Sequence, residues 1–414
     1  MKNVSAITEK ILRFVYAFQL VPKKSIRSLG FNYVYSGEMV NKCIEKGFLK
    51  EQRSQGENLL RITDKGIKYL ESLQGFPFSE QLTLGLEKHT QGTKDRLRQV
   101  KLVWSTAMLY HLVPEIAAQY LEMEEEYSQN ILKSTSLKFK NRTPSLEGHS
   151  KRTLLAYNGT SGRIKKRIQE RSEHDQNGNW YFLMREMRML DEDGFRKLSM
   201  IRAQGVLHLS TGNYAIYNSM SNRMTLSANY EQKYLDYVSR LLHDNDLSLM
   251  VFAKSYKVAL DTIHTHREKR SRFLLGSRLY KKQFYIPLVS GGAKQLDIYA
   301  MPHFREAARE ALLDNADIAR AKNFIYDGET ESRDAIFLGF ECELKEIQSI
   351  YDICSTIRYR CKIIVYCFSW QSKFYYDLFG CPCEIKVVEE GPFMEYLSAR
   401  RRECKESEEV EAAS

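Results

Sequence analysis

The first 75 residues constrain the fold most, because their apolar and capping residues predict three short helices in close succession. Thr8 can cap the first helix, whose apolar face comprises Ile11, Leu12, Val15 and Phe18. Pro22 stands where a second, shorter helix should begin. Ser36 can cap a third helix, and Gly47 ends it in the position that helix C-termini favour. These signals predict a compact N-terminal domain with a helical core.

A β-hairpin is predicted directly after the third helix. Its strands are residues 48–51 and 59–63, and the polar turn 52–57 joins them. A last helix follows, with Ile67, Leu70 and Leu73 on its apolar face. Three helices followed by a hairpin, or wing, are typical of the winged helix-turn-helix fold.

In helix-turn-helix proteins the third helix enters the major groove of DNA and leads with its N-terminal residues. The predicted outward positions of that helix are Tyr35, Ser36, Glu38, Asn41 and Lys42. Asn41 can read an adenine edge. The residues predicted to contact phosphates are Lys42, Lys50, Arg53 and Arg61. The alternative is a protein-docking domain with a solvated polar face, which Glu38 and Glu45 favour because they repel phosphate.

The length of 414 residues predicts two or three domains. We predict a winged helix at 1–75, a helical connector with a long basic insertion at 76–200, an α/β domain at 201–400 and an acidic tail at 401–414. The net charge of +10 and the pI near 9.0 suit a polyanionic partner such as double-stranded DNA. Residues 124–179 are predicted to be a long surface insertion that is either disordered or ordered only on nucleic acid, and a plain solvated insertion is the alternative.

The cysteines and the apolar runs bear on the cellular compartment. Of the eight cysteines, Cys43 stands alone and the others lie from Cys342 onward without paired CxxC spacing. Buried reduced thiols in a cytoplasmic protein are expected, and no metal site is predicted. No apolar run approaches the roughly 20 residues that span a bilayer, so a membrane partner is not expected.

From Gly205 onward, short apolar strands alternate with helices, which predicts an α/β domain with a mixed sheet. The predicted strands include residues 295–299 and 336–344. On the second of these, Glu341, Glu343 and Lys345 would share one face. With Asp297 as a partner acid and Glu231 as an accessory one, this pattern is that of restriction-endonuclease-like folds that bind Mg²⁺. A polar sheet edge or a degenerate site is the alternative.

Two further segments support a family resemblance together with the predicted winged helix and basic connector. They are Arg202-Ala203-Gln204-Gly205-Val206-Leu207 and Tyr214-Ala215-Ile216-Tyr217-Asn218. The chain resembles the replication-relaxation proteins of plasmids and integrative elements. The resemblance implies a winged helix joined to an endonuclease-like α/β domain. The long insertion and the spacing of the acids depart from that pattern.

The implied role is to assist a relaxase or a replication initiator at an origin, without catalysis and without a cofactor. Two alternatives stay open. One is a Mg²⁺-dependent DNA nuclease that uses Asp297, Glu343 and Lys345. The other is a winged-helix transcription regulator whose α/β domain senses a small ligand.

Overall fold

The computed structural model describes residues 6–399 apart from 31–32, 55, 74–92, 118–177, 185–186, 188–201, 221–227, 243, 245, 270–278, 289, 322–324, 356–361 and 381–382. The described chain is a mixture of helices and three β-sheets, so the predicted α/β class is confirmed. The predicted insertion 124–179 and acidic tail 401–414 lie almost entirely outside the described residues.

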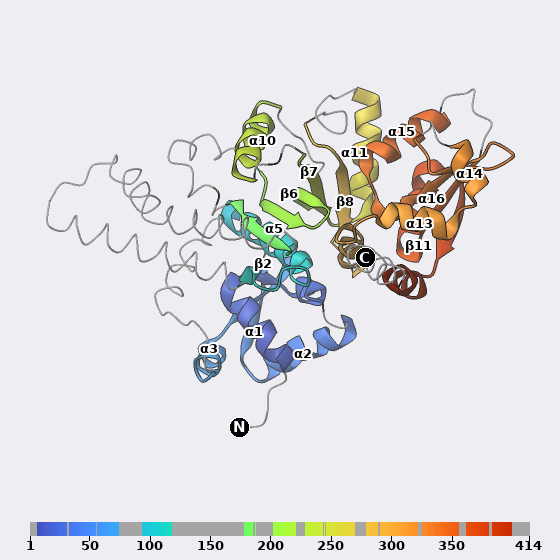
Figure 1. The fold of residues 1–414 in the computed structure, drawn as a ribbon. Helices are drawn as coiled ribbons and strands as arrows, with labels where there is room; N and C mark the ends of the chain where they lie inside the picture. The colour runs from blue at the N-terminus through green and yellow to red at the C-terminus, as the bar shows by residue number, and fades with distance from the viewer. Residues whose placement is uncertain are drawn as a thin grey trace, which may run out of the picture.

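Residues 6–71 form an N-terminal unit in which helices pack on a small sheet of order β1-β3-β2 (Figure 1). Its elements are α1 (Ala6–Phe18), β1 (Val21–Pro22), the 3-10 helix η1 (Lys23–Ser28), α2 (Tyr33–Glu45), β2 (Leu49–Ser54), β3 (Glu57–Ile62) and α3 (Asp64–Glu71). The apolar face predicted for the first helix is fully buried in α1. The predicted order of elements is therefore present.

Two predicted helix caps in this unit are wrong. Thr8 lies within α1, which already includes Ala6, and its side chain is buried. Ser36 lies within α2, which begins at Tyr33, and its side chain is completely buried. The hairpin is also longer than predicted, because Gly56 adopts a φ of 73° that permits a tight turn.

Helix α5 (Thr93–Leu109) joins the N-terminal unit to the rest of the chain. Val103 and Met108 of α5 belong to one hydrophobic core that extends from α1 into the next sheet. Gln99 donates a hydrogen bond to the carbonyl oxygen of Phe18 at 2.9 Å, and Asn218 donates one to that of Lys101 at 2.9 Å. Figure 1 shows α5 between the two parts. The N-terminal unit therefore shares its core with the α/β body, by which we mean the described residues from 178 onward.

The first sheet of the α/β body has the order β4-β5-β6-β7-β8. Its elements are β4 (Trp180–Leu183), β5 (Gly205–Leu209), β6 (Gly212–Met220), α10 (Ala228–Leu242), β7 (Ser248–Ala253), α11 (Tyr256–Lys269) and β8 (Gln283–Pro287). Strands β4, β5 and β6 are antiparallel neighbours, whereas β7 and β8 continue the sheet in parallel. Helical crossovers of this kind are the usual connection between parallel strands.

The second sheet has the order β12-β11-β10-β9, with β10, β11 and β12 parallel. The elements of this part are α12 (Ser290–Tyr299), α13 (Phe304–Leu312), α14 (Asn315–Arg320), β9 (Gly328–Glu329), β10 (Ala335–Leu338), the 3-10 helix η2 (Gly339–Glu341), α15 (Leu344–Ser355), β11 (Ile363–Phe368), α16 (Ser369–Phe379) and β12 (Cys383–Val388). Helix α11 packs between the two sheets through Ala259 and Ile263. The α/β body thus has two sheets, not the single one predicted.

One predicted strand is wrong, and another is shorter than predicted. Residues 295–299 belong to α12, where Gln295 is buried and donates to the carbonyl oxygens of Tyr285 and Glu341. The strand predicted over 336–344 ends at Leu338, and Cys342 has a φ of 51° that breaks the extended chain. Among the described residues, no helix has the length and apolar character needed to cross a membrane.

Candidate nucleic-acid interface

The outer face of α2 is the candidate interface, because it presents polar side chains next to an exposed strand. Tyr35, Glu38, Asn41 and Lys42 are exposed, while Met39, Val40 and Cys43 pack into the core. Ser36 is 0% exposed, so the prediction that it faces outward is wrong. The other four predicted positions of this helix lie together on one face, with Asn41 and Lys42 adjacent.

Arg27 adds a guanidinium beside the second turn of this helix. Its guanidinium packs against Gly37, because a Cβ atom built on that glycine would lie 3.3 Å from Arg27 Nη2. Gly37 lies one turn before Asn41, so Arg27 brings a guanidinium to the same stretch of the helix. No local sequence pattern indicates this position of Arg27, because only tertiary packing brings η1 to α2.

Strand β2 is the outer strand of its sheet and carries the remaining predicted phosphate contacts. Lys50 and Arg53 are exposed, and Arg61 on β3 is half-buried opposite Lys50. Side chains alternate along a strand, so Arg53 shares the face of Leu49, a residue of the core beneath the helices, whereas Lys50 and Arg61 point the other way. The structure therefore places Arg53 on one face of the hairpin and Lys50 and Arg61 on the other, which also carries the buried Leu59.

The tip of the β2–β3 hairpin contacts the α/β body. Glu57 Oε1 lies 2.6 Å from Lys254 Nζ, which follows directly after β7, and the Glu57 side chain is only 13% exposed. Glu51 near the middle of β2 pairs with Lys23 at 2.8 Å. The acidic residues of the hairpin are thus neutralised by lysines, while Arg53 between them stays exposed.

The predicted catalytic residues fall in three different settings. Asp297 lies on α12, where its carboxylate is 2.9 Å from His111 Nε2. His111 Nδ1 lies 3.0 Å from the carbonyl oxygen of Met108, so this pair ties α12 to the end of α5. The strand on which Asp297 was expected is a helix.

Glu343 and Lys345 hold α15 against β8. The Glu343 carboxylate accepts hydrogen bonds from the backbone N–H groups of Gln283 and Glu346, both at 2.7 Å, and the side chain is almost completely buried. Burial raises the pKa of Glu343, and these hydrogen bonds partly offset the rise. Lys345 donates to the carbonyl oxygen of Tyr280, and burial lowers the pKa of its ammonium group. Glu343 thus caps a helix instead of standing on a strand with Lys345.

A nuclease site of the predicted kind needs carboxylates and a lysine on neighbouring strands. Among the contacts of the described residues, no hydrogen bond or ion pair joins Asp297, Glu343 and Lys345. The five strands from β4 to β8 contain no aspartate, glutamate or lysine. The predicted accessory acid, Glu231, is buried and accepts hydrogen bonds from the hydroxyl groups of Tyr217 and Tyr280. Within the described part of the chain, no three His, Cys, Asp or Glu side chains are grouped to hold a metal ion.

No protein-family model, characterised protein or solved structure matches this chain significantly. The functional interpretation therefore rests on the exposed polar side chains of α2 and β2. Asn41 offers an amide that can both donate and accept, and Lys42, Arg53 and Arg27 offer cations. A polar helix face with flanking cations is suited to a polyanion that also carries hydrogen-bonding groups.

Proposed function

We propose that this chain is a double-stranded DNA-binding protein and that residues 6–71 are a winged helix-turn-helix. Support comes from the order of helix, short 3-10 helix, helix and hairpin, and from the third strand β1 beside the hairpin. In this proposal α2 is the recognition helix and β2 with β3 is the wing.

The adjacent exposure of Asn41 and Lys42 on α2 carries the proposal. An asparagine in the major groove can bind the N6 and N7 atoms of adenine in a bidentate manner, which supplies sequence preference. Lys42 next to it is placed to neutralise a phosphate, which fixes the register of the helix on the duplex. Arg27, whose guanidinium lies beside Gly37 one turn before Asn41, adds a second cation along the helix.

In this proposal the wing contacts DNA through its side and not through its tip. Glu57, on the face of Lys50 and Arg61, is engaged by Lys254, whereas Arg53 is exposed on the other face of the hairpin. We infer that Arg53 contacts the DNA backbone beside the groove that α2 occupies. Lys50 and Arg61, which point to the opposite face, contribute less in this arrangement.

We propose that the α/β body is a non-catalytic platform. Its first sheet, three antiparallel strands followed by parallel ones after helix α5, supports a restriction-endonuclease-like fold. The absence of acidic residues from the strands β4 to β8 argues against nuclease activity at that sheet. Together with the family resemblance, this favours a cytoplasmic accessory protein of a mobile element that assists a relaxase or replication initiator.

Selection of binding sites from a random duplex pool tests the DNA proposal. The wild-type protein is expected to enrich a preferred site, and Asn41→Ala to lose about 1–3 kcal/mol of preference for one adenine position. Asn315→Ala, which removes an exposed asparagine from α14, is the matched control and should keep the preference. No enrichment by the wild type, or equal preference in Asn41→Ala, would contradict the proposal.

A further inference from the structure

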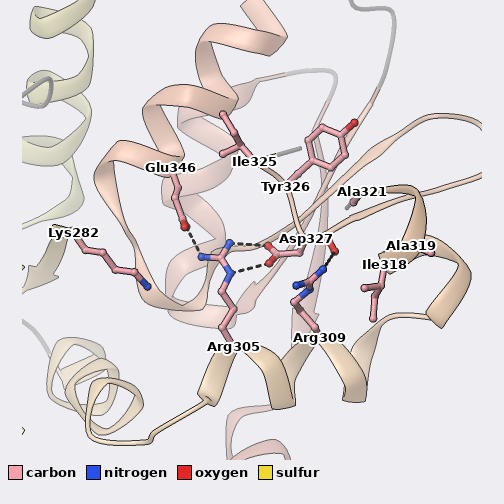
Figure 2. A pocket seen from close by; sticks show the side chains of 10 residues that line it. All are labelled: Lys282, Arg305, Arg309, Ile318, Ala319, Ala321, Ile325, Tyr326, Asp327 and Glu346. Atoms are coloured by element: carbon pink, nitrogen blue, oxygen red, sulfur yellow. Dashed lines mark hydrogen bonds and ion pairs between the residues drawn. The ribbon is translucent and has the colours of Figure 1, made fainter. Parts of the chain in front are cut away.

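A hollow of about 500 Å³ lies in the α/β body between helices α13 and α14, the chain leading into β9, and the first turn of α15. Figure 2 shows Lys282 at one end of it and α14 at the other, with two arginines of α13 along its length. Lys282 directly precedes β8 of the first sheet, whereas α13 packs against β10 of the second. The hollow thus spans the joint between the two sheets.

One of the arginines is held in place by carboxylates. Arg305 makes a bidentate pair with Asp327, at 2.8 and 2.9 Å, and its third nitrogen lies 2.5 Å from Glu346 and 3.4 Å from Glu341. Asp327 is 4% exposed and also accepts a hydrogen bond from the backbone N–H of Leu338. Arg305 is therefore fixed in orientation, and its charge is already neutralised by the protein.

The other two cations keep hydrogen-bonding capacity. Arg309 uses Nη2 to donate to the carbonyl oxygen of Asp327 at 3.1 Å, and among the described residues no carboxylate forms an ion pair with its guanidinium. Lys282 has no ion-pair partner among the residues that the structure describes. Both cations can therefore donate hydrogen bonds to an anionic group in the hollow.

The opposite wall of the hollow is apolar. It is formed by Ile318, Ala319, Ala321 and Ile325. Ile325 is 49% exposed, so its side chain is accessible to a ligand in the hollow. A ligand that carries both an anionic group and an apolar body would satisfy both walls at once, and the volume lies within the range of small-molecule sites.

We propose that this hollow binds a small organic anion, a carboxylate or a phosphate monoester with a compact apolar body. The anionic group lies between Arg309 and Lys282, and the body packs against Ile325 and the α14 wall. Arg305, positioned by Asp327 and Glu346, forms the floor. Because the ligand contacts residues of both sheets, its binding stabilises the joint between them.

Isothermal titration of the full-length protein with phenyl phosphate and with benzoate tests the proposal, and the two probes separate phosphate from carboxylate chemistry. Benzylamine, which has an aromatic body but a positive charge, is the control probe. We expect at least one anion to bind and benzylamine not to bind. Lys282→Gln and Arg309→Gln should each weaken binding by about tenfold or more. Lys281→Gln should not, because that neighbouring lysine pairs with Asp246 instead.

Ile325→Glu keeps the test decisive if Arg309→Gln fails to fold. This exposed position tolerates a polar residue, and the added carboxylate should repel the anion and abolish binding. The proposal would be overturned if neither anion binds the wild type, or if binding persists in both Lys282→Gln and Ile325→Glu. No DNA is present in these titrations, so their outcome is independent of the proposed DNA-binding function.

Discussion

The N-terminal unit and the α/β body place polar and charged side chains in opposite environments. On α2 and β2, Asn41, Lys42 and Arg53 lie in solvent. In the α/β body, Asp327 and Glu343 are almost completely buried, and each is held by several hydrogen bonds. Solvated groups are available to a ligand, whereas buried groups are already committed to the fold. The comparison therefore separates residues that can recognise DNA from residues that hold the protein together.

The largest expected effect is on the free energy of unfolding, when the buried ion pair between Arg305 and Asp327 is broken. Asp327→Ala should lower the free energy of unfolding by about 3–5 kcal/mol, because Arg305 loses its bidentate partner while it remains mostly buried. Urea denaturation measures the loss. Asp377→Ala, which breaks an exposed pair with Lys373 on α16, is the control and should cost less than about 0.5 kcal/mol. Equal losses in the two variants would contradict the distinction between buried and solvated charges.

A smaller effect is expected for Glu343→Gln. The amide keeps one acceptor oxygen, but its NH₂ group faces one of the two backbone donors, so a loss of about 1–2 kcal/mol is expected. DNA binding should be unchanged, and neither the wild type nor the variant should cleave DNA with Mg²⁺ or Mn²⁺. Reproducible nicking by the wild type that disappears in Glu343→Gln and in Asp297→Asn would instead establish the nuclease alternative.

The smallest expected effect is a pH dependence of stability that arises from Glu231. Burial raises the pKa of this carboxyl group above its ordinary value of 4.5, although the hydroxyl groups of Tyr217 and Tyr280 counteract the rise. Its contribution to stability is therefore fully present below pH 4.5 and is lost as the pH rises through the raised pKa. Glu231→Gln cannot titrate, so its stability relative to the wild type should increase between pH 5 and pH 8. Urea midpoints that differ by a constant amount at both pH values would contradict this assignment.

Much of the N-terminal unit could be predicted from the sequence, because its signals are local. The apolar spacing in α1 and the glycine in the hairpin turn act within a few residues. The positions of Arg27 and of the hairpin tip could not be predicted, because the Arg27–Gly37 and Glu57–Lys254 contacts depend on tertiary packing. Ser36 was misassigned because serine is favoured at helix caps, yet its small side chain also fits a buried helix face.

The α/β body was less predictable for a related reason. A short apolar run such as residues 295–299 fits a strand or a buried helix equally well, and length alone could not distinguish them. Glu343 and Lys345 matched a strand pattern by spacing, but Cys342 adopts a left-handed conformation just before them and α15 begins there. The hollow at Arg309 brings together residues from several elements of the α/β body, so no local pattern indicated it.

A salt titration of DNA binding tests most directly whether α2 and β2 form the interface. The logarithm of the binding constant should fall linearly with the logarithm of the salt concentration. Lys42→Ala and Arg53→Ala should each weaken binding and reduce the slope by about one, because each removes one phosphate contact. Lys373→Ala, on α16, is the matched control and should leave the slope unchanged. Slopes and affinities equal to those of the wild type in both Lys42→Ala and Arg53→Ala would remove the DNA role from this surface.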